Sequence, residues 1–242
     1  MRGLIFLCVY VLFFAYPPLR LIHTLAPDVA HHTIVLAFAF SGPALLWLSY
    51  QWRRNRVTRI CARAAYAWVG VAFISLAITL PWELVVALFG IAPPWSGFVL
   101  GATITLVTLW SVYNAQTLST KTIEVSSERL AAPMRLVHIS DVHIGSRSPA
   151  FLKRVIAQVN RLEPDAVAVT GDLVDFHGIT EADLQPFAEL KAPSYFCIGN
   201  HERYIDCDDI CERLKNHGVT VLRNAAVANN TVRWVGIDDA DS

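Results

Sequence analysis

The 242-residue sequence predicts an N-terminal all-α membrane domain of about four transmembrane helices, followed by an α/β domain. Up to residue 120 the chain carries seven Arg, no Lys and two acidic residues, whereas the rest carries 13 basic and 18 acidic residues. Long apolar runs give way at about residue 133 to alternating short strand and helix signals. A hydrophobic content of 54% excludes a disordered chain. Zero net charge excludes a globally basic protein, so no nucleic-acid partner is expected.

Four segments are long and apolar enough to cross a bilayer, which takes about 20 residues. They cover residues 3–19, 33–52, 64–92 and 96–116. The third is longer than one crossing requires and contains Pro81 and Glu83, so it either kinks there or ends in an interfacial segment. Glu83 is a candidate functional carboxylate, but it could equally mark the water interface. The first segment could be a cleaved signal peptide, although no small-x-small cleavage site precedes Pro17.

The distribution of Arg predicts the orientation of these segments. Five arginines lie between the second and third segments: Arg53, Arg54, Arg56, Arg59 and Arg63. The loop after the third segment carries no charge. Because positively charged loops stay in the cytoplasm, both termini and the α/β domain are expected on the cytoplasmic side.

The second half of the chain has the pattern of a parallel α/β sheet. Strand signals cover residues 135–139, 165–170, 194–198, 219–222 and 231–237, and helix signals cover residues 151–162 and 208–216. Residues 165–170 form a continuous apolar run, as in strands that are buried on both faces. The five cysteines do not form a disulfide framework and are expected to be reduced.

Polar residues directly follow three of these strands. The clusters are Asp141 with His143, Asp172 with Asp175, and Asn200 with His201. The carboxyl ends of parallel strands lie along one edge of a sheet, so the three clusters are expected to converge on a single site. Each cluster alone could be an ordinary turn, but the ordered series is difficult to obtain by chance.

These residue types suit two-metal catalysis. Asp141 and His143 can reach one ion, Asp172 can bridge two ions, and Asn200 can offer an amide oxygen to the second. His201 would then face the substrate, and Asp175 is interpreted as a supporting or loop residue rather than a ligand. Mixed oxygen and nitrogen ligands favour Mn, Fe or Zn.

The series Asp141-Val-His143, Gly171-Asp-Leu-Val-Asp175 and Gly199-Asn-His-Glu202 resembles the calcineurin-like metallophosphoesterase superfamily. The leader that ends at His143, behind a multi-span anchor, is similar to the bacterial membrane-associated branch. The resemblance implies a β-sandwich flanked by helices around two divalent metal ions. It also implies that Asp141 and His143 bind the first metal, Asp172 bridges, Asn200 binds the second metal, and His201 protonates the leaving oxygen or stabilises the transition state.

The chain departs from this family at its C-terminal end. Family members continue with a further His ligand and a Gly-His-x-His motif, whereas this chain has no histidine after His217. We therefore expect the second metal site to be incomplete and the domain to be truncated at its C-terminus. A partner chain could supply the missing ligands.

Two hypotheses for function follow. The first is a membrane-anchored phosphoesterase or pyrophosphatase of the bacterial inner membrane, acting on a phosphate ester or a lipid-linked phosphate. The second is an inactive remnant that retains only the first half of the fold. The expected domains are a transmembrane domain (1–116), a connector with a possible first strand (117–132) and the N-terminal part of a phosphoesterase domain (133–242).

Overall fold

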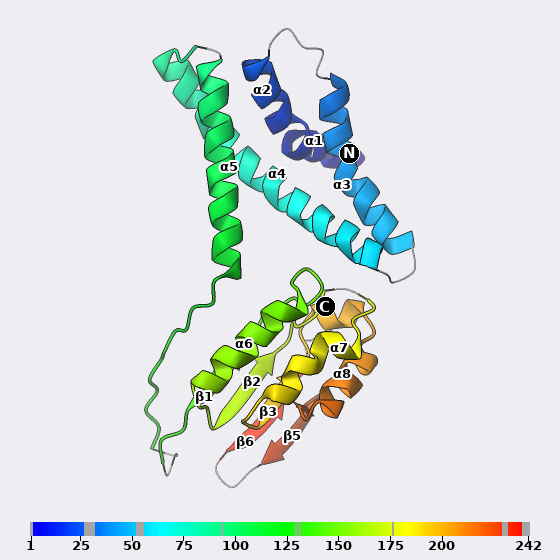
Figure 1. Ribbon diagram of the computed structural model, residues 1–242, viewed down its shortest axis with the longest axis vertical. Helices are drawn as coiled ribbons and strands as arrows, with labels where there is room; N and C mark the ends of the chain where they lie inside the picture. The colour runs from blue at the N-terminus through cyan, green and yellow to red at the C-terminus, as the bar shows by residue number, and fades with distance from the viewer. Residues whose placement is uncertain are drawn as a thin grey trace. The chain divides into compact units, whose positions relative to one another are not determined.

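The structure is a computed structural model, drawn in Figure 1. It describes residues 2–26, 32–51, 56–92, 94–128, 130, 132–175, 177–228 and 232–238. The chain divides into two compact units, with the boundary between Thr117 and Leu118. Arg53 and Arg54 of the five-Arg segment lie outside the described residues, as do residues 239–242.

The first unit is entirely helical. Its helices are α1 (Arg2–Phe14), α2 (Tyr16–Leu25), α3 (His32–Gln51), α4 (Arg56–Phe89) and α5 (Trp95–Gln116). In the described residues, two apolar stretches are long enough to span a bilayer, Ile60–Phe89 in α4 and Trp95–Gln116 in α5. Helices α1 and α2 meet at a bend of 42° and could together form a third span. The described residues therefore support two or three spans, and the fourth predicted span remains a prediction.

Two prolines have different effects on these helices. Pro17 is the second residue of α2, and a proline in the first helical positions costs no hydrogen bond. The chain bends between Phe14 and Tyr16, just before this proline. Pro81 lies inside α4, which nevertheless continues to Phe89 as one helix. The predicted third segment is thus a single element.

Glu83 of α4 is paired with Arg20 of α2. Arg20 Nε donates to Glu83 Oε1, and Arg20 Nη2 donates to Glu83 Oε2 at 2.6 Å. The two side chains neutralise each other, which explains how an acidic residue is accommodated within an apolar helix. The pair also joins α2 to α4.

The second unit contains a four-stranded parallel sheet in the order β1-β2-β3-β4. The strands are β1 (Leu136–Ile139), β2 (Ala166–Thr170), β3 (Ser194–Cys197) and β4 (Thr220–Val221). The connections contain α6 (Pro149–Arg161), α7 (Glu181–Leu184) with the 3₁₀ helix η1 (Gln185–Glu189), and η2 (His201–Tyr204) with α8 (Cys207–Asn216). Figure 1 shows α6, α7 and α8 on one face of the sheet.

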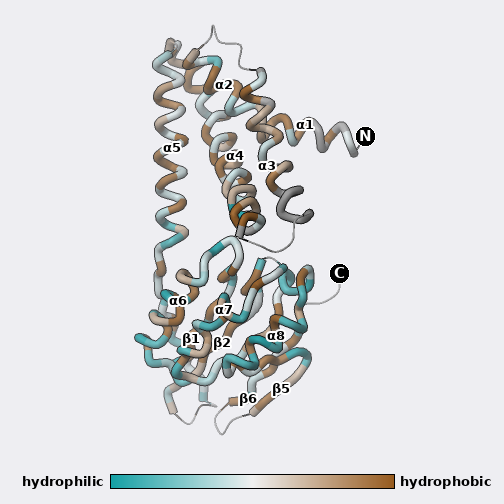
Figure 2. Tube along the Cα trace, turned by 45° about the vertical axis from the view of Figure 1, so that its right-hand side comes forward, coloured by the Kyte–Doolittle hydropathy of each residue, from teal (hydrophilic) through white to brown (hydrophobic). Residues whose placement is uncertain are grey.

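A buried apolar layer joins these helices to the sheet. Val167, Val169 and Phe196 of the strands and Leu152 and Ile156 of α6 are all at most 1% exposed. Figure 2 shows that the two units differ in hydropathy: apolar residues recur along the whole of α5, whereas hydrophilic residues dominate α8. Each helix of the second unit therefore has one apolar face and one polar face.

An antiparallel pair of strands, β5 (Ala225–Ala228) and β6 (Arg233–Gly236), follows the parallel sheet. Trp234 of β6 stacks on Tyr195 of β3 with ring centroids 4.3 Å apart. The described residues thus contain one parallel sheet and a short pair of strands, which confirms the α/β class with a parallel sheet. The two-sheet sandwich remains a prediction.

Candidate metal centre

Three loops at the carboxyl ends of β1, β2 and β3 carry the predicted site residues. We call residues 140–147 the first loop, residues 171–175 the second loop and residues 198–202 the third loop. All three strands are parallel neighbours, so the loops emerge at the same edge of the sheet.

The backbone joins the first loop to the second. His143 N donates to Asp172 O at 3.0 Å, Ile144 N donates to Leu173 O at 2.7 Å, and Asp175 N donates to Ile144 O at 3.1 Å. These bonds continue the pairing of β1 with β2 beyond the strands themselves. They fix Asp141 and His143 relative to Asp172.

Two glycines allow the second and third loops to approach each other. Gly171 has φ +73°, and a Cβ there would overlap the backbone of Gly199. A Cβ on Gly199 would in turn overlap Asp172. Glycine therefore precedes both Asp172 and Asn200 because no other residue leaves room for the two loops to lie together.

Asp141, His143 and Asp172 form one group of possible metal ligands. Each offers one ligand atom, and these atoms lie within 4.8 Å of one another. His143 Nε2 is 3.8 Å from Asp141 Oδ1, which is too long for a hydrogen bond but suits two ligands that face the same ion. This grouping contains the three residues that the sequence predicts around the first metal and the bridging position.

Asn200 lies directly against Asp172. With Nδ2 turned toward Asp172, the side-chain amide of Asn200 donates to both carboxylate oxygens of Asp172 at 3.1 Å. Half a turn of the amide would instead present Oδ1 at the same place, where it could bind a cation together with Asp172. The residues therefore fit a metal at the second position.

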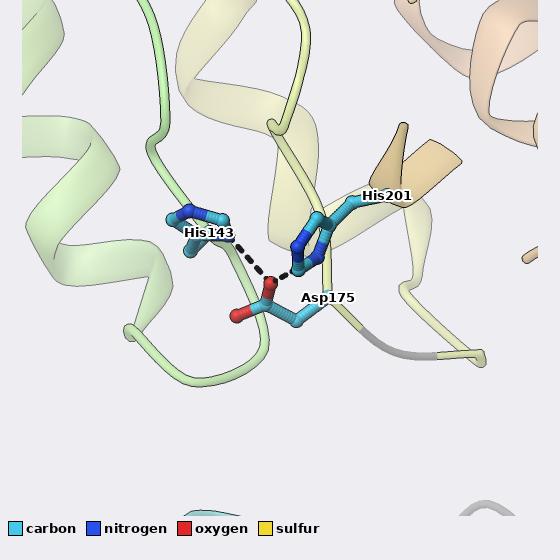
Figure 3. Close-up of side chains that lie close together, drawn as sticks. All are labelled: His143, Asp175 and His201. Carbon is cyan, nitrogen blue, oxygen red and sulfur yellow. Dashed lines mark hydrogen bonds and ion pairs between the residues drawn. The ribbon is translucent and has the colours of Figure 1, made fainter. Parts of the chain in front are cut away.

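His201 belongs to a second group of possible metal ligands, together with His143 and Asp175 (Figure 3). Asp175 Oδ1 lies 2.6 Å from His143 Nδ1 and 3.0 Å from His201 Nδ1. Ser146 Oγ donates to the other oxygen, Oδ2. With only 7% of its side chain exposed, Asp175 is held between the two imidazoles. The structure therefore places Asp175 next to two predicted site residues, in a supporting position.

Sequence reasoning assigned no role to Glu202, which is 0% exposed. Its carboxylate accepts four backbone N–H groups: from Asp172 at 2.9 Å, Leu173 at 2.7 Å, Val174 at 3.1 Å and Gly199 at 2.8 Å. The one available signal was its place beside His201 in the third motif. Its contacts with the second loop depend on the three-dimensional fold.

Comparison with known proteins supports the interpretation of this edge. Residues 134–240 match the calcineurin-like phosphoesterase family. An uncharacterized metallophosphoesterase of Aquifex aeolicus is 32% identical over 129 residues, which cover 50% of this chain and 48% of that protein.

Two further relatives have more informative names. A transmembrane protein with a metallophosphoesterase domain from Danio rerio is 32% identical over 135 residues, covering 50% of this chain and 31% of that protein. UDP-2,3-diacylglucosamine pyrophosphatase LpxG of Chlamydia muridarum is 36% identical over 74 residues, covering 28% of this chain and 22% of that protein. The chain thus matches less than half the length of each of these relatives. Its C-terminal half contains a calcineurin-like metallophosphoesterase domain.

Proposed function

We propose that the protein is a membrane-anchored phosphoesterase that hydrolyses a phosphate ester or pyrophosphate with the help of two divalent metal ions. The observation that carries the proposal is the grouping of Asp141, His143 and Asp172 ligand atoms within 4.8 Å, with the side-chain amide of Asn200 3.1 Å from both carboxylate oxygens of Asp172. Two carboxylates, an imidazole and an amide oxygen are ligands that Mn, Fe or Zn accept.

Asp141 and His143 would hold the first ion, Asp172 would be shared, and Asn200 would hold the second. Bound divalent cations supply positive charge that stabilises the phosphoryl oxygens and promotes ionisation of a water nucleophile. Asp175 accepts the Nδ1 proton of His143, which leaves the Nε2 lone pair free to bind a metal.

His201 is proposed to handle the proton of the leaving group. Asp175 Oδ1 lies 3.0 Å from His201 Nδ1, so it can accept the Nδ1 proton and fix the orientation of the ring. Nε2 is then the atom that can donate a proton to the leaving oxygen. The imidazole of His201 is 39% exposed, so a substrate can reach it.

The proposed substrate is a phosphate ester or pyrophosphate attached to a lipid. The first unit contains two helices that can cross a bilayer, and the Danio rerio relative is named as a transmembrane protein. The Chlamydia muridarum relative is named as a pyrophosphatase of a diacylated sugar nucleotide. The same observations support a multi-pass location in a bacterial inner membrane.

One observation favours the alternative, a domain that binds metal without turning over substrate. In the part of the chain that the structure describes, Asp172 and Asn200 are the two side chains that we assign to the second position. A dinuclear centre needs more ligands than these, from this chain or from a partner.

Hydrolysis assays with the purified chain in detergent distinguish the two. With Mn²⁺ and aryl phosphate monoesters and diesters, the enzyme proposal predicts turnover that Asp172→Asn reduces by more than about 100-fold. Asp183→Asn is a matched control, because Asp183 is a buried carboxylate that forms the capping box of α7 with Thr180 and belongs to none of the three loops. Metal binding without turnover in the unsubstituted chain would favour the alternative.

A further inference from the structure

Glu202 is a buried carboxylate without a cationic partner among the described side chains. Four backbone N–H groups surround it, three from the second loop and one from the third loop. Ionised carboxylates accept hydrogen bonds at both oxygens and form stronger bonds than neutral acceptors. The arrangement balances a negative charge by backbone dipoles alone, as backbone concavities do for bound anions.

Each oxygen of this carboxylate has its own pair of donors. Oε1 accepts from Leu173 N and Val174 N, and Oε2 accepts from Asp172 N and Gly199 N. Oε2 therefore joins the second loop to the third loop at the residues that carry or precede the proposed ligands. A neutral amide at this position could accept at one end only.

The third loop also forms a hydrogen bond to the carboxylate of Asp172. His201 N donates to Asp172 Oδ1 at 3.1 Å, while Asp172 N donates to Glu202 Oε2 at 2.9 Å. Asp172 has φ +50°, a conformation that is unfavourable outside glycine and persists only when neighbours enforce it. Two adjacent residues of the third loop thus fix both the backbone and the carboxylate of Asp172.

We propose that Glu202 is a positioning residue for the metal centre, which aligns Asp172 and Asn200 so that their oxygens face one cation. This inference rests on the proposed function, because it assumes that these oxygens bind metal. Glu202 itself points into the protein and touches no predicted ligand through its own side chain except at the backbone N–H of Asp172. It acts on the metal through the geometry of the two loops.

The test is a Mn²⁺ titration of the full chain and of Glu202→Gln in detergent. We expect the Kd for Mn²⁺ to rise about 10- to 100-fold, the range for groups that orient metal ligands. Activity should recover most of its kcat at saturating Mn²⁺, because the ligands themselves remain. Asp183→Asn also removes a buried charge, one that accepts the backbone N–H and the hydroxyl of Thr180, and it should lower thermal stability and leave the Kd unchanged.

An unchanged Kd in folded Glu202→Gln would overturn the proposal, as would an equal rise in Asp183→Asn. If Glu202→Gln does not fold, Glu202→Asp is titrated instead. It keeps the charge but is too short to reach all four donors, so a raised Kd is again expected and an unchanged one contradicts the proposal. Failure of the unsubstituted chain to bind Mn²⁺ would refute the proposed function instead.

Discussion

Three of the predicted ligands have left-handed backbone conformations. Asp141, His143 and Asp172 have φ values of 57°, 55° and 50°. Asp and His tolerate this region better than most residues, yet each still carries a conformational cost. The loop-to-loop hydrogen bonds from His143 N and Asp172 N hold two of these conformations in place. Strain concentrated in these loops is what a preorganised ligand set requires.

Asp175 should orient both His143 and His201. Asp175→Asn replaces the charged acceptor of two Nδ1 groups with a neutral amide oxygen, which forms weaker hydrogen bonds, so we expect metal affinity or kcat to fall about 10- to 100-fold. The Mn²⁺ dependence of hydrolysis measures this effect. Ser146→Ala is the control, because it removes only the donor to the other carboxylate oxygen and should cause a smaller loss. Equal effects of the two substitutions would argue against orientation of the histidines by Asp175.

The thiol of Cys211 should be unreactive in the folded protein. Burial raises the pKa of Cys211 to about 12, and the neighbouring Cys207 adds to the rise. An unfolded thiol titrates near 8.5, so the folded state holds its proton from about pH 9 to 12 and loses relative stability as pH rises through that window. Alkylation by iodoacetamide at pH 8.5 should therefore be slow at Cys211 in native protein and fast in urea. Equally fast alkylation in both states would contradict this.

At the scale of elements, the four strands of the parallel sheet, strand β6 and helices α6 and α8 were predicted within one or two residues, whereas strand β5 was not predicted. Strand β3 (Ser194–Cys197) and helix α8 (Cys207–Asn216) match the predicted 194–198 and 208–216. Short elements such as η2 and α7 have too few residues to show a period, so the sequence did not predict them. The contacts of Glu202 could not be predicted for another reason, since three of its four hydrogen-bond partners lie 28 to 30 positions away along the chain.

The first unit shows where sequence rules mislead. A proline inside a helix removes one backbone hydrogen bond, which led us to allow for a kink or an end near Pro81. Helix α4 continues past it, as proline-containing membrane helices can when neighbours or local adjustments satisfy the freed group. A bend of 42° lies between α1 and α2, where a predicted single span becomes two helices.

Helices α2 and α5 pack closely at a pair of glycines. A Cβ on Gly97 would lie 2.7 Å from Thr24 Oγ1, and one on Gly101 would lie 3.3 Å from Leu21 Cδ1. This spacing is the small-xxx-small pattern that lets membrane helices approach. We expect Gly97→Leu to lower the free energy of unfolding in detergent by about 1–3 kcal/mol.

Gly70→Leu is the matched control for this packing, because a Cβ at Gly70 of α4 meets nothing within 4 Å. Thermal unfolding of both variants measures the difference. If Gly97→Leu were as stable as Gly70→Leu, the close approach of α2 and α5 would not be needed for stability.

At the scale of the whole molecule, sidedness depends on α4 and α5 alone. If α4 and α5 each cross the membrane once, α4 carries the chain away from the side of the five-Arg segment and α5 brings it back before Leu118. This holds for any arrangement of α1, α2 and α3. The positive-inside rule then predicts that the second unit lies in the cytoplasm. A reporter that is active only in the cytoplasm, fused to the C-terminus, should give signal; a signal only from a periplasmic reporter would contradict this topology.

The central claim is that side chains from three loops bind metal at one edge of the parallel sheet. Anomalous diffraction from crystals of the full chain soaked in Mn²⁺ tests it most directly. The account predicts a peak about 2.0–2.3 Å from an Asp172 carboxylate oxygen, with Asn200 Oδ1 or the Asp141 and His143 ligand atoms at similar distances. Saturated crystals without a peak at these loops, or with Mn²⁺ bound only elsewhere, would contradict it.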